Sequence, residues 1–506
     1  MSLRGYSVPF SRRSVCSFPF EKHQELIEYG HLRVCRQGGP KLTKSPIVRL
    51  RQAACTAVLL FCIATCGVAQ TFKTLASFNG ANGMSPGYGA LVQGLDGSFY
   101  GTTEQVAVIF RITPGGTLTK LADLGGGTPY AGLELATDGD LYGTTSTTVF
   151  RTTSKGTQTT VHTFEFRQGN APFGGLLQLG NGTLYGTAYS GGENGNAGTV
   201  YAVTPGGSFD RLYSFCSQPN CTDGANPFAV LIKGTDGNLY GTTFNGGTAT
   251  SGCGGSGCGT VFKINASSKA LTTLYSFCSQ ANCTDGANPD AGLVQASDGN
   301  FYGTTFQGGG SNLGTIFRIA PDGTLTTLYS FCSQTKCPDG ANPTAALVQA
   351  TDGNLYGTTR GAGAEHFGTI FKITLGGSFS ALHSFEPADG GNPLAGLLQA
   401  TNGNLYGTTY SEGANGVGTV YEFSVGLKPF AQALPDSGKV GATVKILGYK
   451  LKGSTAVSFN GTPALFTVVS NTEIKVAVPS GATTGFVTVT TPSGTLKSNK
   501  KFQVLH

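Results

Sequence analysis

The chain has 506 residues, with 33 Lys or Arg against 27 Asp or Glu, and it contains no tryptophan. This length can build more than one hydrophobic core. The net charge of +6 arises at the N-terminus, because residues 1–51 hold ten basic and three acidic residues and the remainder is close to −1. No basic cluster remains after that segment, which excludes nucleic acid as an expected partner.

Residues 1–47 are basic and contain no repeat, so we interpret them as a leader or a mis-assigned start. A signal peptide is predicted at residues 48–69, where Arg49 and Arg51 precede an apolar run that ends in small residues. The run is too short to favour a membrane span. We therefore expect a secreted or cell-surface protein that does not span the membrane after processing.

One sequence unit recurs seven times between residues 71 and 425, each time around a Tyr-Gly-Thr core. A repeat of about 40–60 residues is typical of arrays whose units bury their cores against their neighbours. We expect the core tyrosines to pack between units. They are Tyr100, Tyr142, Tyr185, Tyr240, Tyr302, Tyr356 and Tyr406.

The unit around Tyr356 contains four runs rich in β-branched and aromatic residues, separated by Gly, Asp and Asn. This pattern predicts four antiparallel strands, which we name a, b, c and d. Asp352-Gly353, between strands a and b, predicts a tight type I′ hairpin. The four runs are residues 346–350, 355–359, 368–374 and 379–385.

The copies of strand d are offset from the others. The first copy, at residues 74–78, precedes the first strand a, and the last repeat stops after strand c. A closed ring whose N-terminal strand completes the last blade explains this offset, and radial blades protect sheet edges. We predict a seven-bladed β-propeller at residues 71–425. A linear solenoid is the alternative, but it would require neither the additional strand d at the N-terminus nor the absence of strand d from the last repeat.

The Leu-Tyr-Gly-Thr-Thr core, followed by Gly-Thr-Val-Phe-Lys-Ile and Leu-Tyr-Ser-Phe runs, resembles the GloVer tandem repeat of exported bacterial proteins. The resemblance covers residues 71–425 and implies export and a repeat array, with no established activity. Residues 427–506, with runs such as Val457-Ser458-Phe459-Asn460-Gly461, resemble an IPT/TIG domain, an immunoglobulin-like β-sandwich. Such domains act as spacers or binding modules in exported bacterial proteins.

Eight cysteines after the leader form four C-x4-C pairs, three of which occupy the same slot just after strand d. An even number in an exported, glycine-rich chain predicts local disulfides that pin loops. Zinc bound by thiolates and free thiols are the alternatives, but structural zinc sites bring two pairs together, and these pairs are expected on separate blades. We expect no metal and no cofactor. The pairs are Cys216 with Cys221, Cys253 with Cys258, Cys278 with Cys283, and Cys332 with Cys337.

All four pairs fall in d–a or b–c loops, which leave a propeller on the same face. The b–c loops vary in length, and specificity tends to lie on variable loops of a rigid scaffold. Acidic or imidazole side chains on b–c loops can serve acid–base chemistry or be solvated loop charges. These candidates are Glu193, Glu365, His366 and Glu412.

Aromatic residues follow a proline just before strand a in four copies. Their rings can stack on sugars or wedge between blades, and we favour the wedge. They are Tyr88, Tyr130, Phe173 and Phe228. His162 and His383 replace the strand-d tyrosine, so we expect them to be packing residues.

No catalytic constellation is visible, so the sequence favours a non-enzymatic role. We predict an exported binding or adhesion protein for an extracellular polysaccharide or envelope component, which includes an envelope protein. The alternatives are an extracellular lyase or hydrolase at the mouth of the propeller channel, and a structural surface protein without a small ligand.

Overall fold

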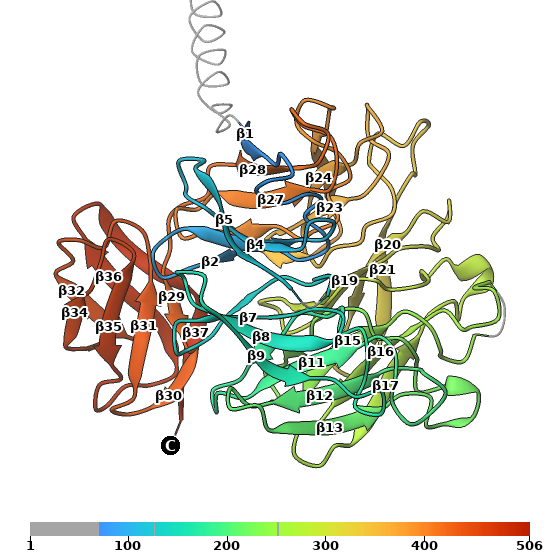
Figure 1. The fold of residues 1–506 in the computed structure, drawn as a ribbon, viewed down its shortest axis with the longest axis horizontal. Helices are drawn as coiled ribbons and strands as arrows, with labels where there is room; N and C mark the ends of the chain where they lie inside the picture. The colour runs from blue at the N-terminus through green and yellow to red at the C-terminus, as the bar shows by residue number, and fades with distance from the viewer. Residues whose placement is uncertain (1–69, 126, 250–251, 506) are drawn as a thin grey trace, which may run out of the picture. The chain divides into compact units, whose positions relative to one another are not determined.

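The structure is a computed structural model that describes residues 70–125, 127–249 and 252–505, nearly all of them in strands and turns (Figure 1). These residues belong to one compact unit, Val68–His506. The predicted leader at 1–47 and signal peptide at 48–69 lie outside the described residues. In the described part of the chain, no helix combines the length and hydropathy that a membrane span requires.

Seven four-stranded antiparallel sheets form the blades. Blades 1 and 2 contain β2 (Val92–Gln93), β3 (Phe99–Thr103), β4 (Val108–Ile112) and β5 (Leu118–Asp123), then β6 (Glu134–Leu135), β7 (Leu141–Thr144), β8 (Thr148–Thr152) and β9 (Gln158–Thr163). Blades 3 and 4 contain β10 (Leu177–Gln178), β11 (Leu184–Ala188), β12 (Thr199–Val203) and β13 (Phe209–Ser214), then β14 (Ile232–Lys233), β15 (Leu239–Thr243), β16 (Thr260–Ile264) and β17 (Leu271–Ser276). Blades 5 and 6 contain β18 (Val294–Gln295), β19 (Phe301–Thr305), β20 (Thr315–Ile319) and β21 (Leu325–Ser330), then β22 (Val348–Gln349), β23 (Leu355–Thr359), β24 (Thr369–Ile373) and β25 (Phe379–Ser384). Short 3-10 helices lie at Pro219–Cys221 and Ala281–Cys283.

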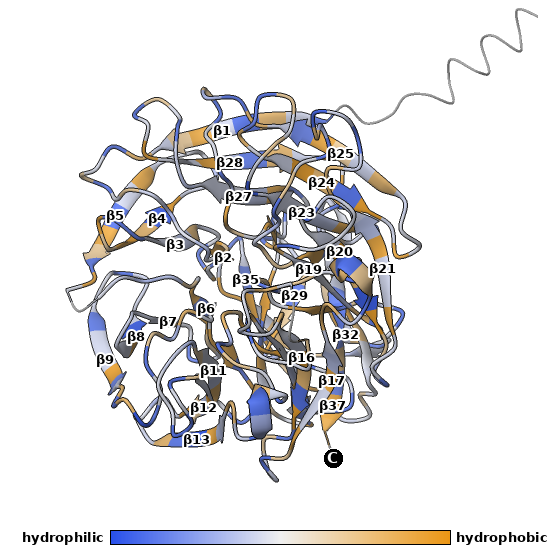
Figure 2. Ribbon diagram, turned by 90° about the vertical axis from the view of Figure 1, so that its right-hand side faces the viewer, coloured by the Kyte–Doolittle hydropathy of each residue, from blue (hydrophilic) through white to orange (hydrophobic). Residues whose placement is uncertain are grey.

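Blade 7 is completed by the N-terminal strand. Its order is β1 (Thr71–Ser77), β28 (Thr419–Ser424), β27 (Leu405–Thr409) and β26 (Leu398–Gln399), and β1 pairs antiparallel with β28. The backbone N–H of Thr401 also donates to Gln93 Oε1 of blade 1 at 2.9 Å. In Figure 2 the fourth strands, such as β5, β9 and β13, lie at the rim and β2 and β6 lie toward the middle. The predicted closed seven-bladed ring is confirmed.

The repeated tyrosine is fixed to its own hairpin. Tyr356 is only 2% exposed, and its hydroxyl donates to Asp352 at 2.9 Å. The following Gly357 leaves room for the strand-c ring, because a Cβ there would lie 2.6 Å from Phe371. The Tyr-Gly pair therefore joins the a–b turn to the interior of the blade.

The two threonines that follow make different contacts. The hydroxyl of Thr358 donates to the carbonyl oxygen of Ala395 in the next blade at 3.1 Å. The hydroxyl of Thr359 lies 2.9 Å from that of Thr369 on strand c of its own blade. The first threonine thus joins neighbouring blades and the second joins strands within a blade.

The a–b turn differs from the predicted type I′ hairpin. The N–H of Ala350 donates to Asn354 O and the N–H of Gly353 donates to Ala350 O, both at 2.9 Å, so the loop has three residues. Gly353 has a φ of 83°, whereas Asp352 is not among the residues of positive φ. A type I′ turn needs positive φ at both central residues, while a three-residue loop needs it only at its last residue. Asp352 instead accepts the tyrosine hydroxyl.

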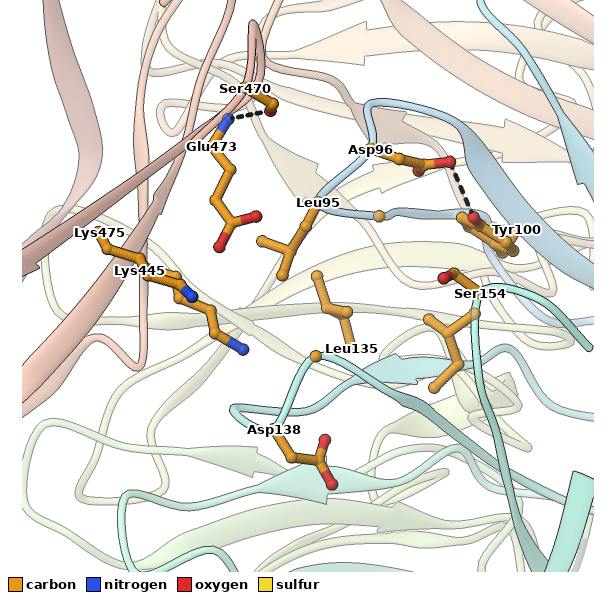
Figure 3. Close-up of a pocket in the computed structure, with 13 residues that line it drawn as sticks. Leu95, Asp96, Tyr100, Leu135, Asp138, Ser154, Lys445, Ser470, Glu473 and Lys475 are labelled. Carbon is orange, nitrogen blue, oxygen red and sulfur yellow. Dashed lines mark hydrogen bonds between the residues drawn. The ribbon is translucent and has the colours of Figure 1, made fainter. Parts of the chain in front are cut away.

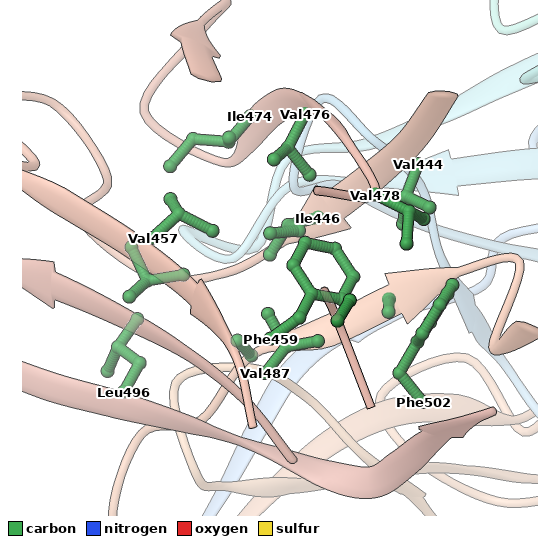
Figure 4. Packing of buried hydrophobic residues seen from close by; sticks show 14 of the residues in the cluster. Val444, Ile446, Val457, Phe459, Ile474, Val476, Val478, Val487, Leu496 and Phe502 are labelled. Atoms are coloured by element: carbon green, nitrogen blue, oxygen red, sulfur yellow. The ribbon is translucent and has the colours of Figure 1, made fainter. Parts of the chain in front are cut away.

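The C-terminal strands form a sandwich of two sheets with one hydrophobic core. One sheet has the order β29 (Gln432–Leu434), β31 (Thr443–Leu447), β35 (Glu473–Ala477) and β34 (Phe466–Val468). The other has the order β30 (Ser437–Lys439), β37 (Gly494–Leu505), β36 (Gly485–Thr491), β32 (Ala456–Phe459) and β33 (Thr462–Pro463). Val444, Ile446, Phe459 and Val487 are buried between them, and Phe459 meets Phe502 edge to face at 5.0 Å (Figure 4). Alternating inward side chains explain this core.

Candidate functional site

The d–a and b–c loops share one face of the propeller, as the sequence predicted. Ala225 in a d–a loop forms a β-bridge with Asn245 in a b–c loop. The a–b turns lie at the other ends of the strands. Those of blades 1 and 2 contact the sandwich, because Lys445 Nζ donates to Thr137 O at 2.8 Å and Thr472 Oγ1 donates to Leu95 O at 2.6 Å. The loop face is therefore opposite the face that meets the sandwich.

Two positions on the loop face differ from blade to blade, although their neighbours repeat. The first follows the proline of each d–a loop, with Gly87 in between in blade 1, and in blade order it is Tyr88, Tyr130, Phe173, Phe228, Asp290, Thr344 and Leu394. The second follows the core threonines, and it is Glu104, Ser146, Tyr189, Phe244, Phe306, Arg360 and Tyr410. We call these fourteen positions the axial positions. Variation within an otherwise repeated frame indicates a role other than building the blade.

The structure brings the four predicted aromatic residues together. The ring centroids of Tyr88 and Phe228 are 5.2 Å apart, those of Phe173 and Phe228 5.3 Å, and those of Tyr130 and Phe173 4.3 Å. Tyr189 lies 5.3 Å from Phe173. Blades 1 and 4 are not neighbours, so Tyr88 and Phe228 meet across the axis. The favoured interpretation of these rings as wedges between blades is wrong for Tyr88 and Phe228. We call these five residues the axial aromatic patch.

The patch is half-buried and rests on closely packed backbone. A Cβ on Gly89, which follows Tyr88, would lie 2.1 Å from the backbone nitrogen of Gly132 in blade 2. A Cβ on Gly132 would lie 2.6 Å from Ala90 O. Only glycine fits at these two positions, because the chains after the aromatic residues touch each other. The aromatic rings therefore stand on a rigid base.

Charged groups lie next to the aromatic rings. Burial raises the pKa of Asp290 to about 7, an effect opposed by Arg360. Burial also raises the pKa of Glu104, opposed by a hydrogen bond from Tyr410. The pKa of Tyr88 is raised by burial first and then by Asp290 and Glu104, while Arg360 lowers it. The hydroxyl of Tyr88 is thus within electrostatic reach of both acids and of the arginine.

The predicted acidic and imidazole candidates lie elsewhere on the loop face. Glu193 forms an ion pair with Arg211 of β13, the outermost strand of blade 3, at 2.5 Å. Glu365 and His366 are exposed, and the N–H of the preceding residue donates to a serine at the end of the outer strand β25. In the loop that carries Glu412, the N–H of Ala414 likewise donates to Ser77 Oγ at the end of the outer strand β1. These b–c loop tips lie toward the rim.

The four cysteine pairs form disulfides in the structure, as predicted: Cys216–Cys221, Cys253–Cys258, Cys278–Cys283 and Cys332–Cys337. Two of these disulfides lie side by side, since the sulfur atoms of Cys258, Cys278 and Cys283 are within 4.8 Å of one another. The expectation that the pairs stay apart on separate blades is wrong for these two, because the long b–c loop of blade 4 folds over the following d–a loop. Their sulfur atoms already form disulfide bonds, so this cluster offers no thiolate to a metal.

The Cys332–Cys337 disulfide closes the third of the loops that follow strand d, and Cys337 has nearly the same backbone conformation as its counterparts, with a φ of 49° against 53° for Cys221 and 52° for Cys283. In the other two loops the second cysteine ends a short 3-10 helix, which the next residue closes, as Thr222 N–H does by donating to Pro219 O at 3.4 Å. The residue after Cys337 is Pro338, which has no N–H to donate, and the described residues around it form no 3-10 helix. The equivalence of the three slots extends to the backbone at the second cysteine, because the N–H of Cys337 donates to Gln334 O at 2.9 Å as that of Cys221 does to Gln218 O at 3.0 Å. Only the closing bond from the residue after the cysteine differs.

Cys337 pins its loop in the predicted manner. Its carbonyl oxygen accepts the N–H of Gly363, in the b–c loop of the next blade, at 2.9 Å. The carbonyl oxygen of Cys221 accepts the N–H of Gly247 at the same distance. The disulfides therefore fix d–a loops that in turn hold the adjacent b–c loops, which makes this side of the loop face rigid.

The two strand-d histidines are packing residues. His383 stacks on Phe72 with ring centroids 4.1 Å apart and contacts Asp389 through Nε2 at 3.0 Å. His162 stacks on Phe209 at 4.5 Å. Neither residue joins the axial aromatic patch through these contacts, so we assign them no chemical role.

A cavity of 420 Å³ lies between the a–b turns of blades 1 and 2 and the sandwich (Figure 3). Its walls carry both charges, with Lys475 and Glu473 from the sandwich and Asp138 from blade 2. Several of its polar groups already hold the two parts together or fix hairpins, as the bonds from Lys445 to Thr137 and from Tyr100 to Asp96 show. We therefore regard the cavity as part of the contact between propeller and sandwich.

The sequence pointed to four members of the patch but missed Asp290, Arg360, Tyr410 and Tyr189. A signal for them is present in the chain. When the seven repeats are aligned on Pro and on Thr-Thr, Asp290 occupies the same column as the predicted aromatics, and Tyr189, Arg360 and Tyr410 occupy the variable column after the core threonines. Loop length and charge, in contrast, pointed to the tips of the b–c loops.

Residues 145–347 and 332–442 match the model of the Gloeobacter/Verrucomicrobia repeat, and residues 432–504 match the IPT/TIG domain. The chain belongs to the Gloeobacter/Verrucomicrobia repeat family. The matched residues begin within blade 2, in line with the looser sequence of the first copies. A search of curated proteins finds no match.

Solved structures share the propeller fold at low identity. A catalytically inactive virginiamycin B lyase from Staphylococcus aureus with quinupristin is 16% identical, with 70% of this chain and 99% of that chain covered and a TM-score of 0.50. A streptogramin B lyase is 16% identical over 70% and 97%, with a TM-score of 0.49. An oligogalacturonate lyase from Vibrio parahaemolyticus is 12% identical over 71% and 97%, with a TM-score of 0.43. This similarity shows the fold alone.

Proposed function

We propose that this repeat-family protein is exported and binds a carbohydrate at the axial aromatic patch without turning it over. The observation that carries the proposal is the meeting of half-buried aromatic rings from four blades, as in the contact of Tyr88 with Phe228. Aromatic faces stack on the apolar faces of sugar rings, and a few polar groups at the edge fix orientation. Glu104, Asp290 and Arg360 are such groups.

Export is supported by two further features. The four disulfides fit an extracellular protein, because such bonds persist in oxidising compartments. The predicted signal peptide at residues 48–69 provides the route. The sandwich then serves as a spacer or second contact that leaves the loop face free.

One observation favours turnover as the second candidate. The carboxyl of Asp290 forms no hydrogen bond within residues 70–125, 127–249 and 252–505, and its pKa of about 7 suits a general acid or base near neutral pH. An extracellular lyase or hydrolase would use Asp290 with Tyr88 beside it. The aromatic patch is compatible with both binding without turnover and a lyase or hydrolase activity. A measurement of product formation distinguishes the two.

The test uses the protein with its disulfides oxidised, a panel of polysaccharides, and two readouts: retention and released sugar. Phe173→Ala should weaken retention about 5-fold, since a lost stacking contact is worth about 1 kcal/mol. Phe166→Ala is the matched control, because Phe166 is 60% exposed on a d–a loop outside the patch.

Retention that is lost in Phe173→Ala and kept in Phe166→Ala supports the proposal. Sugar release that is abolished in Asp290→Asn overturns the non-enzymatic assignment and favours the lyase or hydrolase. Absence of both retention and release across the panel contradicts carbohydrate binding and favours a protein partner.

A further inference from the structure

The axial positions contain a single cation. Among the fourteen, Arg360 is the only Lys or Arg. Its side chain is exposed, and it forms no ion pair or hydrogen bond with any residue in the described part of the chain. A guanidinium presents a planar set of donors that matches a carboxylate in two parallel hydrogen bonds. Arg360 is therefore available to a ligand.

The arginine lies at the edge of the patch. Asp290 on blade 5 and Tyr88 on blade 1 are both within its electrostatic reach. Tyr88 in turn contacts the ring of Phe228. A sugar stacked on this part of the patch would bring its ring substituents toward Arg360.

We propose that the carbohydrate bound at the axial aromatic patch is acidic, and that Arg360 binds the carboxylate of a uronic acid residue. This inference rests on the proposed function and adds a substrate class to it. A uronate provides the guanidinium with a planar, charged acceptor of the right shape, which a neutral sugar lacks.

The two nearby acids make this recognition depend on pH. Asp290 is faced by Arg360 and Tyr88, and Glu104 is faced by Tyr410, Tyr88 and Tyr130. Arg360 is the only cation among these groups. When the acids are protonated they can donate hydrogen bonds to the ligand, and when they are ionised they repel its carboxylate. Binding should therefore weaken as the pH rises from 5.5 to 8.

The test compares acidic polymers with neutral versions of themselves. Alginate, polygalacturonate and hyaluronan are each offered beside the same polymer after reduction of its carboxyl groups to primary alcohols, and dextran sulfate provides a non-carboxylate anion. Retention of at least one acidic polymer should fall about 10-fold on reduction. It should fall by a similar factor in Arg360→Gln. Arg167→Gln is the control, because Arg167 is exposed on a d–a loop outside the patch.

Three results overturn the inference while leaving carbohydrate binding intact: equal retention of parent and reduced polymers, full retention in Arg360→Gln, or equal retention of dextran sulfate. Binding that depends on Phe173 but not on Arg360 assigns a neutral glycan. Absence of retention for every polymer, acidic or neutral, contradicts the proposed function itself. A fall in retention from pH 5.5 to 8 that disappears in Asp290→Asn supports the stated role of that carboxyl.

Discussion

The residues inside the blades are repeated from blade to blade, whereas the residues at the axial positions vary, although both belong to the same sequence repeat. Inside the blades, the same contacts recur: the Tyr356 hydroxyl on Asp352 has counterparts such as Tyr240 on Asp236. At the axial positions the residue type changes around the ring, from Phe228 in blade 4 to Asp290 in blade 5 and Thr344 in blade 6. The repeated contacts hold the ring together, and the varied ones form a surface that is specific to this protein. Substitutions in the two regions should have separable effects.

The largest effect on stability and binding is expected from removal of the strand that closes the ring. Deletion of β1, residues 71–77, removes the partner of β28 and leaves blade 7 with an open edge. We expect loss of the cooperative unfolding transition and of all retention on glycans. Circular dichroism and thermal unfolding measure this change.

A peptide of residues 70–78 added in trans is the control for the closing strand. It should restore part of the transition if the missing strand is the cause. A deletion variant that unfolds like the intact protein would contradict ring closure as the source of stability.

The next largest effect on stability is expected at Tyr356, a repeated residue of the blade interior. Tyr356→Ala should lower the free energy of unfolding by about 3–5 kcal/mol, because a fully buried aromatic ring is lost. Tyr356→Phe removes only the hydrogen bond to Asp352 and should cost about 1 kcal/mol. Denaturant titration gives both values. The folded fraction of either variant should bind glycan as the wild type does. A loss of binding without a loss of stability would instead assign Tyr356 a role in ligand binding.

A smaller effect than that of Tyr356→Ala, and opposite in sign, is expected at an axial position. The pKa of Asp290 is about 7 in the folded protein and near 4 in the unfolded chain, so the folded state binds more protons between these values. Its burial therefore destabilises the fold increasingly as the pH rises from 4 to 7. Asp290→Asn should raise the free energy of unfolding by about 1–2 kcal/mol at pH 8 and leave it nearly unchanged at pH 4. Unfolding curves at the two pH values test this, and a uniform shift at both would exclude titration of Asp290 as the cause.

The fold was predictable from the sequence because the motifs that specify it are local and repeated. Tyr-Gly-Thr-Thr cores, Asp-Gly turns and the offset of strand d are visible without any long-range information. The C-x4-C pairs are close in the chain, so their disulfides were also predictable. The type of the a–b turn was not predicted, because Asp352 has a second role as acceptor for Tyr356, which only the packed blade shows.

The sequence by itself determined the number of blades, the closure of the ring by its first strand, the sandwich that follows and the pairing of the cysteines. Only the tertiary structure decided that Tyr88 and Phe228 touch, that Asp290 and Arg360 stand beside them, and that Glu193 lies toward the rim. The physical reason is that strands and turns depend on hydrogen bonds and side-chain periods within one repeat. Contacts across the axis depend on where seven blades meet, which no single repeat contains.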